Sequence, residues 1–434
     1  MVQNIIQAVL KLLAGMGVFL VAMRLLTQNL ESLAGNKIKS AFEKISKSNW
    51  AGLFLGTAVT ALVQSSGAVS VMTVGFVDAG FMTLKQAATI IYGANIGTTI
   101  NAQIVALGFL NSGSGVPIDV VFGALAGVGA LIMLFAKNQK LKKIGAIAAA
   151  FGMMFVGLSL MTASMGGLAK SREVSDFLYA LKNPALLLLA GIALTAVLQS
   201  SSAMNSLTIA MIFGGLLSLN QGIYLIYGSN IGTCFVALLA CAGSGINAKR
   251  TGLIHLLFNV FGVAVFISID LLLGLGGWSF ARILETVFPL VPATQLAMMH
   301  TFFNTLTVVV MLPLTNLLIK LVVKLMPEKF KAQTDGQNYA AELEKIEEEL
   351  NSLEKSAKKS GANWGRAQKQ KDTALFNFMS RGIKNKLFAL NKKHRRDQEL
   401  KNQTDEMLSR LKMITKISRK NFKMPKTYVF PSEN

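Results

Sequence analysis

Residues 56–68 read GTAVTALVQSSGA, and residues 191–203 read GIALTAVLQSSSA. The run YGANIGT at 92–98 returns as YGSNIGT at 227–233, at the same offset (191 − 56 = 135 residues). Over residues 56–98, 19 of 43 positions match their partners without a gap. The chain therefore contains an internal duplication, which is a common signature of membrane transporters, and the repeated element combines apolar segments with Gln, Ser, Asn and Thr.

Charge divides the chain into two parts. Residues 1–327 hold 19 Lys and Arg and 8 Asp and Glu, which leaves 24 and 14 of the totals of 43 and 22 for residues 328–434. We expect residues 1–327 to be a polytopic transmembrane domain and residues 328–434 to be a basic helical tail. The net charge of +21 does not make nucleic acid an expected partner, because the cations of the first part lie in short loops between apolar segments.

Apolar segments of two kinds occur in the first part. Segments that predict full membrane spans cover about 8–27, 85–108, 118–136, 144–167, 219–242, 251–274 and 296–323. Two further stretches, 51–79 and 184–213, are interrupted midway by the Gln-Ser-Ser motif. Each is long for one span and too polar at its centre for lipid contact, so we expect two re-entrant helical hairpins.

Loop cations favour this topology. With both hairpins re-entrant, one side of the membrane receives 13 loop Lys and Arg, and the other receives Lys170, Arg172, Lys182 and Arg282. The cation-rich side is expected to be cytoplasmic, which places the C-terminal tail in the cytoplasm and the domain in the cell inner (plasma) membrane.

Three predicted spans separate the hairpins, so the hairpins are expected to enter from opposite sides. The fold class we predict is therefore an all-α polytopic membrane protein with two inverted-topology repeats and a helical cytoplasmic tail. Repeat 1 covers about 8–108 and repeat 2 about 144–242, and the extra spans are 118–136, 251–274 and 296–323.

The Gln-Ser-Ser motif supplies the donors that an oxyanion needs. A helix that begins after the motif directs its N-terminus, with about half a positive charge, towards the middle of the membrane. No Lys or Arg occurs in 51–84 or in 184–219, so an anion there must rely on helix dipoles, backbone N–H groups, hydroxyls, amides and co-bound cations. The expected substrate-binding residues are Gln64, Ser65, Ser66, Gln199, Ser200, Ser201 and Ser202.

The Gly-x-Asn-Ile-Gly-Thr motif predicts a sodium site. Its glycines would let a transmembrane helix break, and the unwound carbonyls with neutral side-chain oxygens would suit an alkali cation. The expected sodium residues are Asn95, Thr98, Asn230, Thr233, Thr60 and Thr195. Sodium beside the anion would offset a burial cost on the order of tens of kcal/mol.

These residues resemble the type II sodium/phosphate cotransporter family, whose hallmark is a duplicated Gln-Ser-Ser-Ser motif followed by Gly-Ala-Asn-Ile-Gly-Thr. The resemblance covers about residues 5–325. It implies a symporter, not an enzyme, that imports inorganic phosphate with sodium by alternating access and needs no cofactor beyond the coupling ions. The first copy departs from the hallmark, because Gly67 stands where a third serine is expected.

Several alternatives remain open at this stage. Small residues in spans also serve helix packing alone. The same architecture could carry sulfate, arsenate or a dicarboxylate, or could act as a membrane phosphate sensor or scaffold through its tail. A homodimer is one of the assemblies left open, and the partner of the tail is unknown.

Two features lie outside these motifs. The pattern His-x-x-Phe-Asn occurs at 255–259 and again at 300–304, and we expect it to make structural hydrogen bonds between helices. In the tail, apolar residues at helical spacing predict two amphipathic helices: Leu343, Ile346, Leu350 and Leu353, then Leu408, Leu411, Ile414 and Ile417. Bacterial family members often end in an all-helical domain resembling the phosphate-signalling regulator PhoU, and this tail is compatible with a reduced version.

Overall fold

The computed structural model divides the chain into two compact units, which are treated separately below. One unit consists of Met1–Asp78 and Met82–Pro327, and the other of Ala79–Phe81 and Glu328–Asn434. The described residues are 2–43, 48–109, 118–169, 171, 174, 176, 183–288, 291–327, 335–359, 380, 382–384, 386–387 and 398–422.

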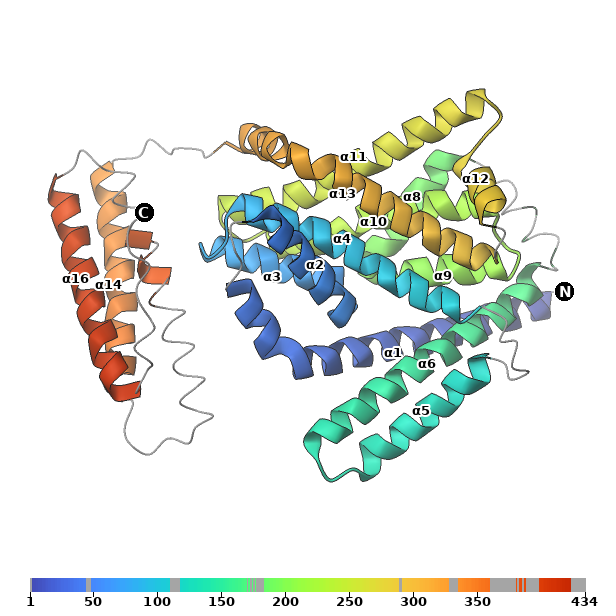
Figure 1. The fold of residues 1–434 in the computed structure, drawn as a ribbon, viewed down its shortest axis with the longest axis horizontal. Coiled ribbons are helices and arrows are strands. Elements are labelled where there is room, and N and C mark those ends of the chain that lie inside the picture. The colour runs from blue at the N-terminus through green and yellow to red at the C-terminus, as the bar shows by residue number, and fades with distance from the viewer. Residues whose placement is uncertain are drawn as a thin grey trace. The chain divides into compact units, whose positions relative to one another are not determined.

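Helices make up the regular secondary structure of the described residues in the larger unit (Figure 1). In chain order they are α1 (Val2–Glu43), α2 (Asn49–Val63), α3 (Ser66–Asp78), α4 (Leu84–Leu107), α5 (Ile118–Phe135), α6 (Gln139–Ala169), α8 (Pro184–Leu198), α9 (Ser201–Phe213), α10 (Leu219–Ala240), α11 (Ile246–Leu275), α12 (Phe280–Val287) and α13 (Pro292–Leu325).

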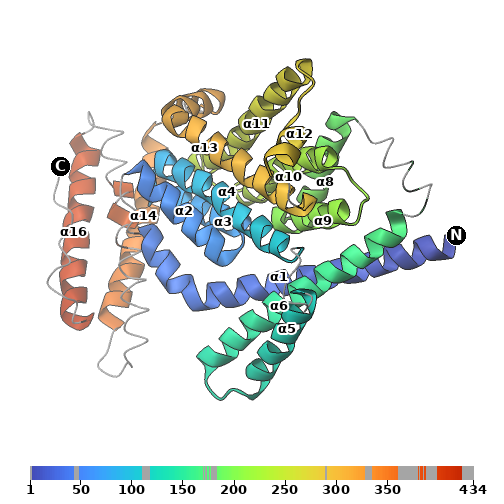
Figure 2. The ribbon, with the colours of Figure 1, turned by 45° about the vertical axis from the view of Figure 1, so that its right-hand side comes forward.

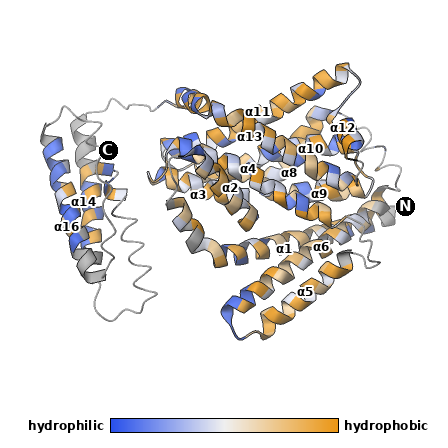
Figure 3. Cartoon of the chain, in the orientation of Figure 1, coloured by the Kyte–Doolittle hydropathy of each residue, from blue (hydrophilic) through white to orange (hydrophobic). Residues whose placement is uncertain are grey.

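The long helices of this unit are apolar over most of their length (Figure 3). Among the described residues, 6 helices are long and apolar enough to cross a membrane: α1, α4, α6, α10, α11 and α13. The segment expected at 118–136 forms α5, which has 18 residues and is about 27 Å long at 1.5 Å per residue. The prediction of an all-α polytopic membrane protein is confirmed.

Each stretch expected to form a hairpin consists of two short helices separated at the Gln-Ser pair. Helices α2 and α8 have 15 residues each, and α3 and α9 have 13 each. Such helices are about 20–23 Å long and fall short of a hydrocarbon core of about 30 Å. The re-entrant hairpin itself, the side from which each pair enters and the inverted relation of the repeats stay predictions. The name hairpin is used below for the helix pairs α2–α3 and α8–α9.

The predicted breaks at the Gly-x-Asn-Ile-Gly-Thr motifs are wrong. Helix α4 runs without interruption through residues 92–98, and α10 runs through residues 227–233. The glycines instead bring two backbones together: a Cβ on Gly93 would overlap the carbonyl oxygen of Leu53 in α2. Since only glycine fits there, close helix packing explains these residues without any unwinding.

The same close packing occurs in the second repeat. A Cβ on Gly228 would overlap the carbonyl oxygen of Leu188 in α8, and a Cβ on Gly232 would lie 2.7 Å from the carbonyl oxygen of Ile192. Figures 1 and 2 show α2 beside α4 and α8 beside α10. Each hairpin is therefore held through its first helix by the long helix of its own repeat.

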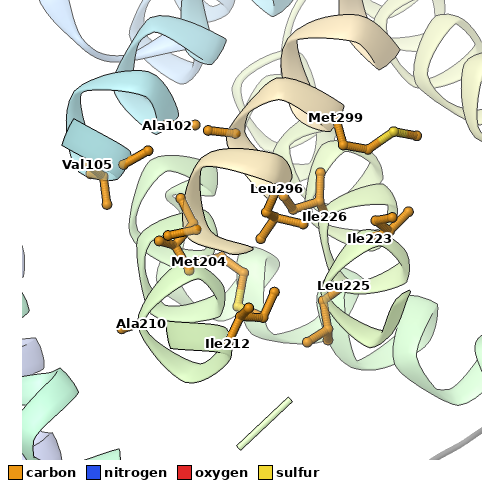
Figure 4. Close-up of a cluster of buried hydrophobic side chains, with 14 of the residues drawn as sticks. Ala102, Val105, Met204, Ala210, Ile212, Ile223, Leu225, Ile226, Leu296 and Met299 are labelled. Carbon is orange, nitrogen blue, oxygen red and sulfur yellow. The ribbon is translucent and has the colours of Figure 1, made fainter. Parts of the chain in front are cut away.

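The second helix of each hairpin packs against the long helices of both repeats. Helix α3 packs against α4 of its own repeat and also against α10 and α11, and α9 packs against α10 of its own repeat and also against α4 and α13. Figure 4 shows this for α9: Met204 and Ile212 lie in a cluster with Val105 of α4, Ile226 of α10 and Leu296 of α13. Helix α4 of the first repeat thus shares this core with the second repeat, and the start of α9 lies within it. Val69 and Val77 of α3 belong to a separate cluster with side chains of α1, α2 and α4.

The smaller unit has its own core. Helices α14 (Asp335–Lys359) and α16 (Gln398–Phe422) pack together. The buried side chains are Leu343, Ile346, Leu350, Leu353, Ile383, Leu387, Leu411 and Ile414, with Leu408 partly buried beside them. Both amphipathic helices are confirmed for these residues, while the side chain of Ile417 lies outside the described ones. The similarity to PhoU stays a prediction.

Replacement of Gly93 by alanine tests the backbone packing. We expect Gly93→Ala to lower the free energy of unfolding by about 3 kcal/mol, because the new methyl group has no room against α2. Thermal unfolding of the purified protein in detergent measures the change. The matched control is Gly127→Ala in α5, where a Cβ would meet no atom within 4 Å, so helix propensity should leave stability unchanged or raise it by up to about 1 kcal/mol. Equal effects of the two substitutions would contradict the packing.

Candidate functional site

A left-handed residue breaks each hairpin at the same repeat position. Gln64 has φ 60° and Gln199 has φ 51°, and they are the non-glycine residues with positive φ among those described. Each ends the first helix of its hairpin. This conformation costs on the order of 1–2 kcal/mol for a residue with a Cβ, so its occurrence at both equivalent positions indicates a functional constraint.

The serine after each glutamine caps the helix that follows. Ser65 Oγ accepts a hydrogen bond from the Ala68 amide at 3.1 Å, and Ser200 Oγ accepts one from the Ala203 amide at 3.2 Å. A hydroxyl that accepts in this way keeps its own O–H free to donate. The capping serines are therefore oriented, and they remain usable as donors to an anion.

The next backbone amides of each tip precede the first intrahelical hydrogen bond. They belong to Ser66 and Gly67 in the first hairpin and to Ser201 and Ser202 in the second. The side chains of Ser66, Ser201 and Ser202 are buried. Each tip thus presents free N–H groups, hydroxyls and the positive end of a helix dipole, a combination that binds anions without a formal positive charge.

Gly67 has a physical reason to differ from serine. A Cβ at this position would lie 3.4 Å from Cγ1 of Val236 in α10. Space is sufficient for a small side chain, but a hydroxyl would face an isopropyl group that can neither donate nor accept. The missing hydroxyl in the first motif is therefore matched by an apolar neighbour from the other repeat.

The structure brings the threonines of the sodium prediction against the glycine motifs. A Cβ on Gly97 would lie 2.7 Å from the Cβ of Thr60, and a Cβ on Gly232 would lie 2.8 Å from the Cβ of Thr195. Both threonines are buried, and neither hydroxyl has a hydrogen-bond partner among the described residues. An unpaired buried hydroxyl is costly, so these oxygens suit a ligand such as a cation.

The asparagines and later threonines of the motif are placed differently. Asn95 Nδ2 donates to Ile91 O at 2.9 Å, and Thr98 Oγ1 donates to Ala94 O at 2.9 Å, as in an ordinary helix. At about 100° per residue, Asn95 lies about 200° around α4 from Gly93 and Gly97. The continuous helix therefore keeps Asn95 on a different face from the one that meets Thr60.

The second copy repeats most of this arrangement. Thr233 Oγ1 donates to Ser229 O at 2.9 Å, while Asn230 is buried and its Nδ2 has no partner among the described residues. The six residues of the sodium prediction are thus all buried. The asparagines Asn95 and Asn230 lie on other helix faces than the glycines that meet Thr60 and Thr195.

Sequence reasoning missed Asn101, which lies at the first hairpin tip. Its Nδ2 donates to Gln64 Oε1 at 2.9 Å and lies 3.8 Å from the sulfur of Met23 in α1. Its equivalent in the second repeat (101 + 135 = 236) is Val236. The sequence shows only that one copy carries a polar residue here and the other does not, and this difference does not reveal the contact with Gln64.

The His-x-x-Phe-Asn pattern ties a further helix to each repeat. The ring of Phe258 in α11 stacks on Tyr92 of α4 with centroids 4.6 Å apart, and Phe303 in α13 contacts Tyr227 of α10 at 5.1 Å. His300 Nε2 lies 3.5 Å from Asn205 Nδ2 of α9. Asn259 Nδ2 donates to Cys234 Sγ of α10 at 3.4 Å, so each copy of the pattern makes a polar contact between helices beside its ring contact.

Comparison with known proteins adds independent information. The chain matches a protein family described as Na+/Pi-cotransporter over residues 18–163 and 165–280, and each stretch contains one copy of both motifs. It is 31% identical over 312 residues to "Uncharacterized protein YqeW" of Bacillus subtilis, which covers 72% of this chain and 96% of that protein. No solved structure matches the chain.

Two other relatives carry functional names. "Putative inorganic phosphate export protein YjbB" of Escherichia coli is 26% identical over 264 residues, 60% of this chain and 45% of that protein. "Sodium-dependent phosphate transport protein 2C" of Homo sapiens is 40% identical over 82 residues, 18% of this chain and 14% of that protein. The chain therefore spans less than half the length of each of these two relatives.

Replacement of Thr195 by valine tests whether its buried hydroxyl binds sodium. Valine has nearly the same shape, so we expect Thr195→Val to melt at the wild-type temperature or higher without sodium, and to lose the rise in melting temperature that sodium chloride produces over choline chloride. The control is Thr208→Val in α9, a buried threonine whose hydroxyl donates to Met204 O, which should keep the sodium-dependent rise. Full sodium stabilisation of Thr195→Val would exclude this hydroxyl as a ligand.

Proposed function

Since this chain belongs to the Na+/Pi-cotransporter family, a family of transporters and not of enzymes, we propose that it imports inorganic phosphate with sodium by alternating access. The loop charges support a location in the plasma membrane with the C-terminal tail in the cytoplasm. Phosphate and sodium are the partners that the family implies.

The pair of interrupted hairpins is the observation that carries this proposal. Both tips have a left-handed glutamine, a capping serine and free amides at the start of a helix. Donors of this kind match the oxygens of a tetrahedral anion, and hydrogen bonds to a charged group contribute about 1.5–3 kcal/mol each. Phosphate would be held by Ser65 and Ser66 from one side and by Gln199, Ser200, Ser201 and Ser202 from the other.

Sodium would supply the positive charge that the tips lack. Burial of an uncompensated dianion in a medium of low dielectric costs on the order of tens of kcal/mol, and helix dipoles offset only part of it. Thr60 and Thr195 each have a buried hydroxyl without a partner among the described residues, next to a glycine motif. These two hydroxyls support a coupling-ion site beside each tip.

The packing of the hairpins suggests how the site could open to each side. Their first helices rest on the long helix of the same repeat, and their second helices lie between the long helices of both repeats. A shift of one repeat relative to the other would therefore change the surroundings of both tips. In the proposed cycle this shift exposes the anion first to one side of the membrane and then to the other.

Export is the second candidate, because one relative is named as a putative inorganic phosphate export protein. A coupled carrier runs in the direction that the combined gradients dictate, so the same tips can serve either direction. The direction is tested by loading vesicles with phosphate and reversing the sodium gradient.

Uptake of radiolabelled phosphate into proteoliposomes tests the proposal. We expect uptake that requires an inward sodium gradient and disappears when potassium replaces sodium. Ser200→Ala should weaken phosphate transport about ten-fold or more, the effect of losing one hydrogen bond to a charged ligand. Gln64→Ala should also impair transport, because it removes the side chain whose hydrogen bond with Asn101 holds the first tip. Equal uptake in sodium and potassium, or uptake driven only by protons, would refute sodium coupling.

A matched control separates site effects from damage to the fold. Ser268 in α11 donates only to Ala264 O of its own helix, so Ser268→Ala should transport as wild type does. Competition by sulfate, arsenate and dicarboxylates in the same vesicles identifies the substrate. If another anion competes with radiolabelled phosphate more strongly than unlabelled phosphate does, that anion is the preferred substrate.

A further inference from the structure

The two motif glutamines differ in what their side chains bind. Gln64 Nε2 donates to Ala61 O, and Gln64 Oε1 accepts from Asn101 Nδ2 at 2.9 Å. The Gln64 backbone N–H donates to Thr60 O at 2.7 Å. Both polar atoms of this side chain are therefore engaged within the protein, on α2 and on α4.

The equivalent glutamine of the second hairpin is free. Gln199 has the same left-handed backbone, but its side chain is exposed and makes no hydrogen bond to the described residues. The difference is not one of turn geometry, since φ differs by only 9° between the two (60 − 51). It must come from the surroundings of each tip.

Asn101 accounts for the difference. It is buried, with 3% of its surface exposed, and it reaches from α4 to the first tip. Val236 stands at the equivalent position of α10 and has no polar atom with which to hold Gln199. The second repeat therefore lacks the donor that fixes the first tip.

We infer that Asn101 is a positioning residue that anchors the first tip, and that Gln199 is the glutamine whose amide contacts the transported oxyanion. This inference rests on the proposed function for the identity of the anion. The amide of Gln64 is used to hold the tip of α2–α3 against α4. The amide of Gln199 is left to donate to phosphate and to move with the tip of α8–α9.

Unequal anchoring has a direct physical consequence. A tip held by a partly buried hydrogen bond opens less often than one without it, since local opening must break that bond. The second tip is then the more mobile of the two, and it gains its partner only when the anion is bound. Binding of phosphate should therefore order the second tip more than the first.

Amide hydrogen exchange of the full-length protein in nanodiscs tests the anchoring without any transport. In sodium chloride without phosphate, we expect residues 61–68 to exchange more slowly than residues 196–203. Asn101→Val, which installs the residue of the second repeat, should speed exchange at 61–68 about five-fold and leave 196–203 unchanged. Gln64→Asn keeps a residue that tolerates the left-handed backbone but shortens the amide, and should act in the same way.

A neighbouring amide provides the matched control. Gln103, two residues further along α4, donates to Thr301 Oγ1 at 2.8 Å and has Leu238 as its counterpart. Gln103→Leu removes one hydrogen bond between helices without touching a tip, so exchange at 61–68 should stay at the wild-type rate. Equal exchange of the two wild-type tips, or no response of 61–68 to Asn101→Val, would overturn the anchoring.

The KM for phosphate transport, measured for the single and double variants, tests the assignment of the two glutamines. Asn101→Val and Gln64→Asn should raise the KM for inorganic phosphate by similar factors and have no larger effect together, because both break the same bond. Gln199→Leu should raise KM about ten-fold and multiply with either one. Additive effects of Asn101→Val and Gln64→Asn, or an unchanged KM in Gln199→Leu, would contradict the assignment. If no phosphate flux occurs at all, the proposed function fails, while the exchange measurements still decide the anchoring.

Discussion

A chain that turns back inside a bilayer must satisfy its own backbone groups, because hydrocarbon offers no hydrogen-bond partners. The rest of this transport unit depends on how the two tips meet that constraint. A left-handed glutamine ends one helix, and a serine hydroxyl caps the next within two residues. The few N–H groups that remain unpaired are the ones that a translocated anion can use.

Backbone contact between helices keeps the tips in place. Gly93 and Gly228 let α4 and α10 approach α2 and α8 so closely that a methyl group would meet a carbonyl oxygen. Such contact fixes the distance and the rotation of each pair, since side chains cannot adjust to fill a gap. The glycines therefore contribute to the site by holding its scaffold rather than by opening a helix.

The duplicated motifs were enough to predict the helical membrane domain, the interruption of each hairpin stretch and the proximity of Thr60 to the glycine motif. They could not decide what the glycines do, because the same small residues permit unwinding and close packing. Only the position of α2 against Gly93 and Gly97 shows that these glycines serve close packing and not unwinding. Asn101 was beyond prediction for another reason: its role depends on a contact with Gln64 that a single polar residue in an apolar helix does not reveal.

The contact between Gly67 and Val236 has a consequence for the history of the duplication. Suppose that repeat 1 were replaced by a second copy of repeat 2. Serine at position 67 would then face Val236, and valine at position 101 would leave the amide oxygen of Gln64 without its donor. The two halves are therefore not interchangeable at these two positions, although the backbone and the shared motif residues keep the symmetry of the duplication.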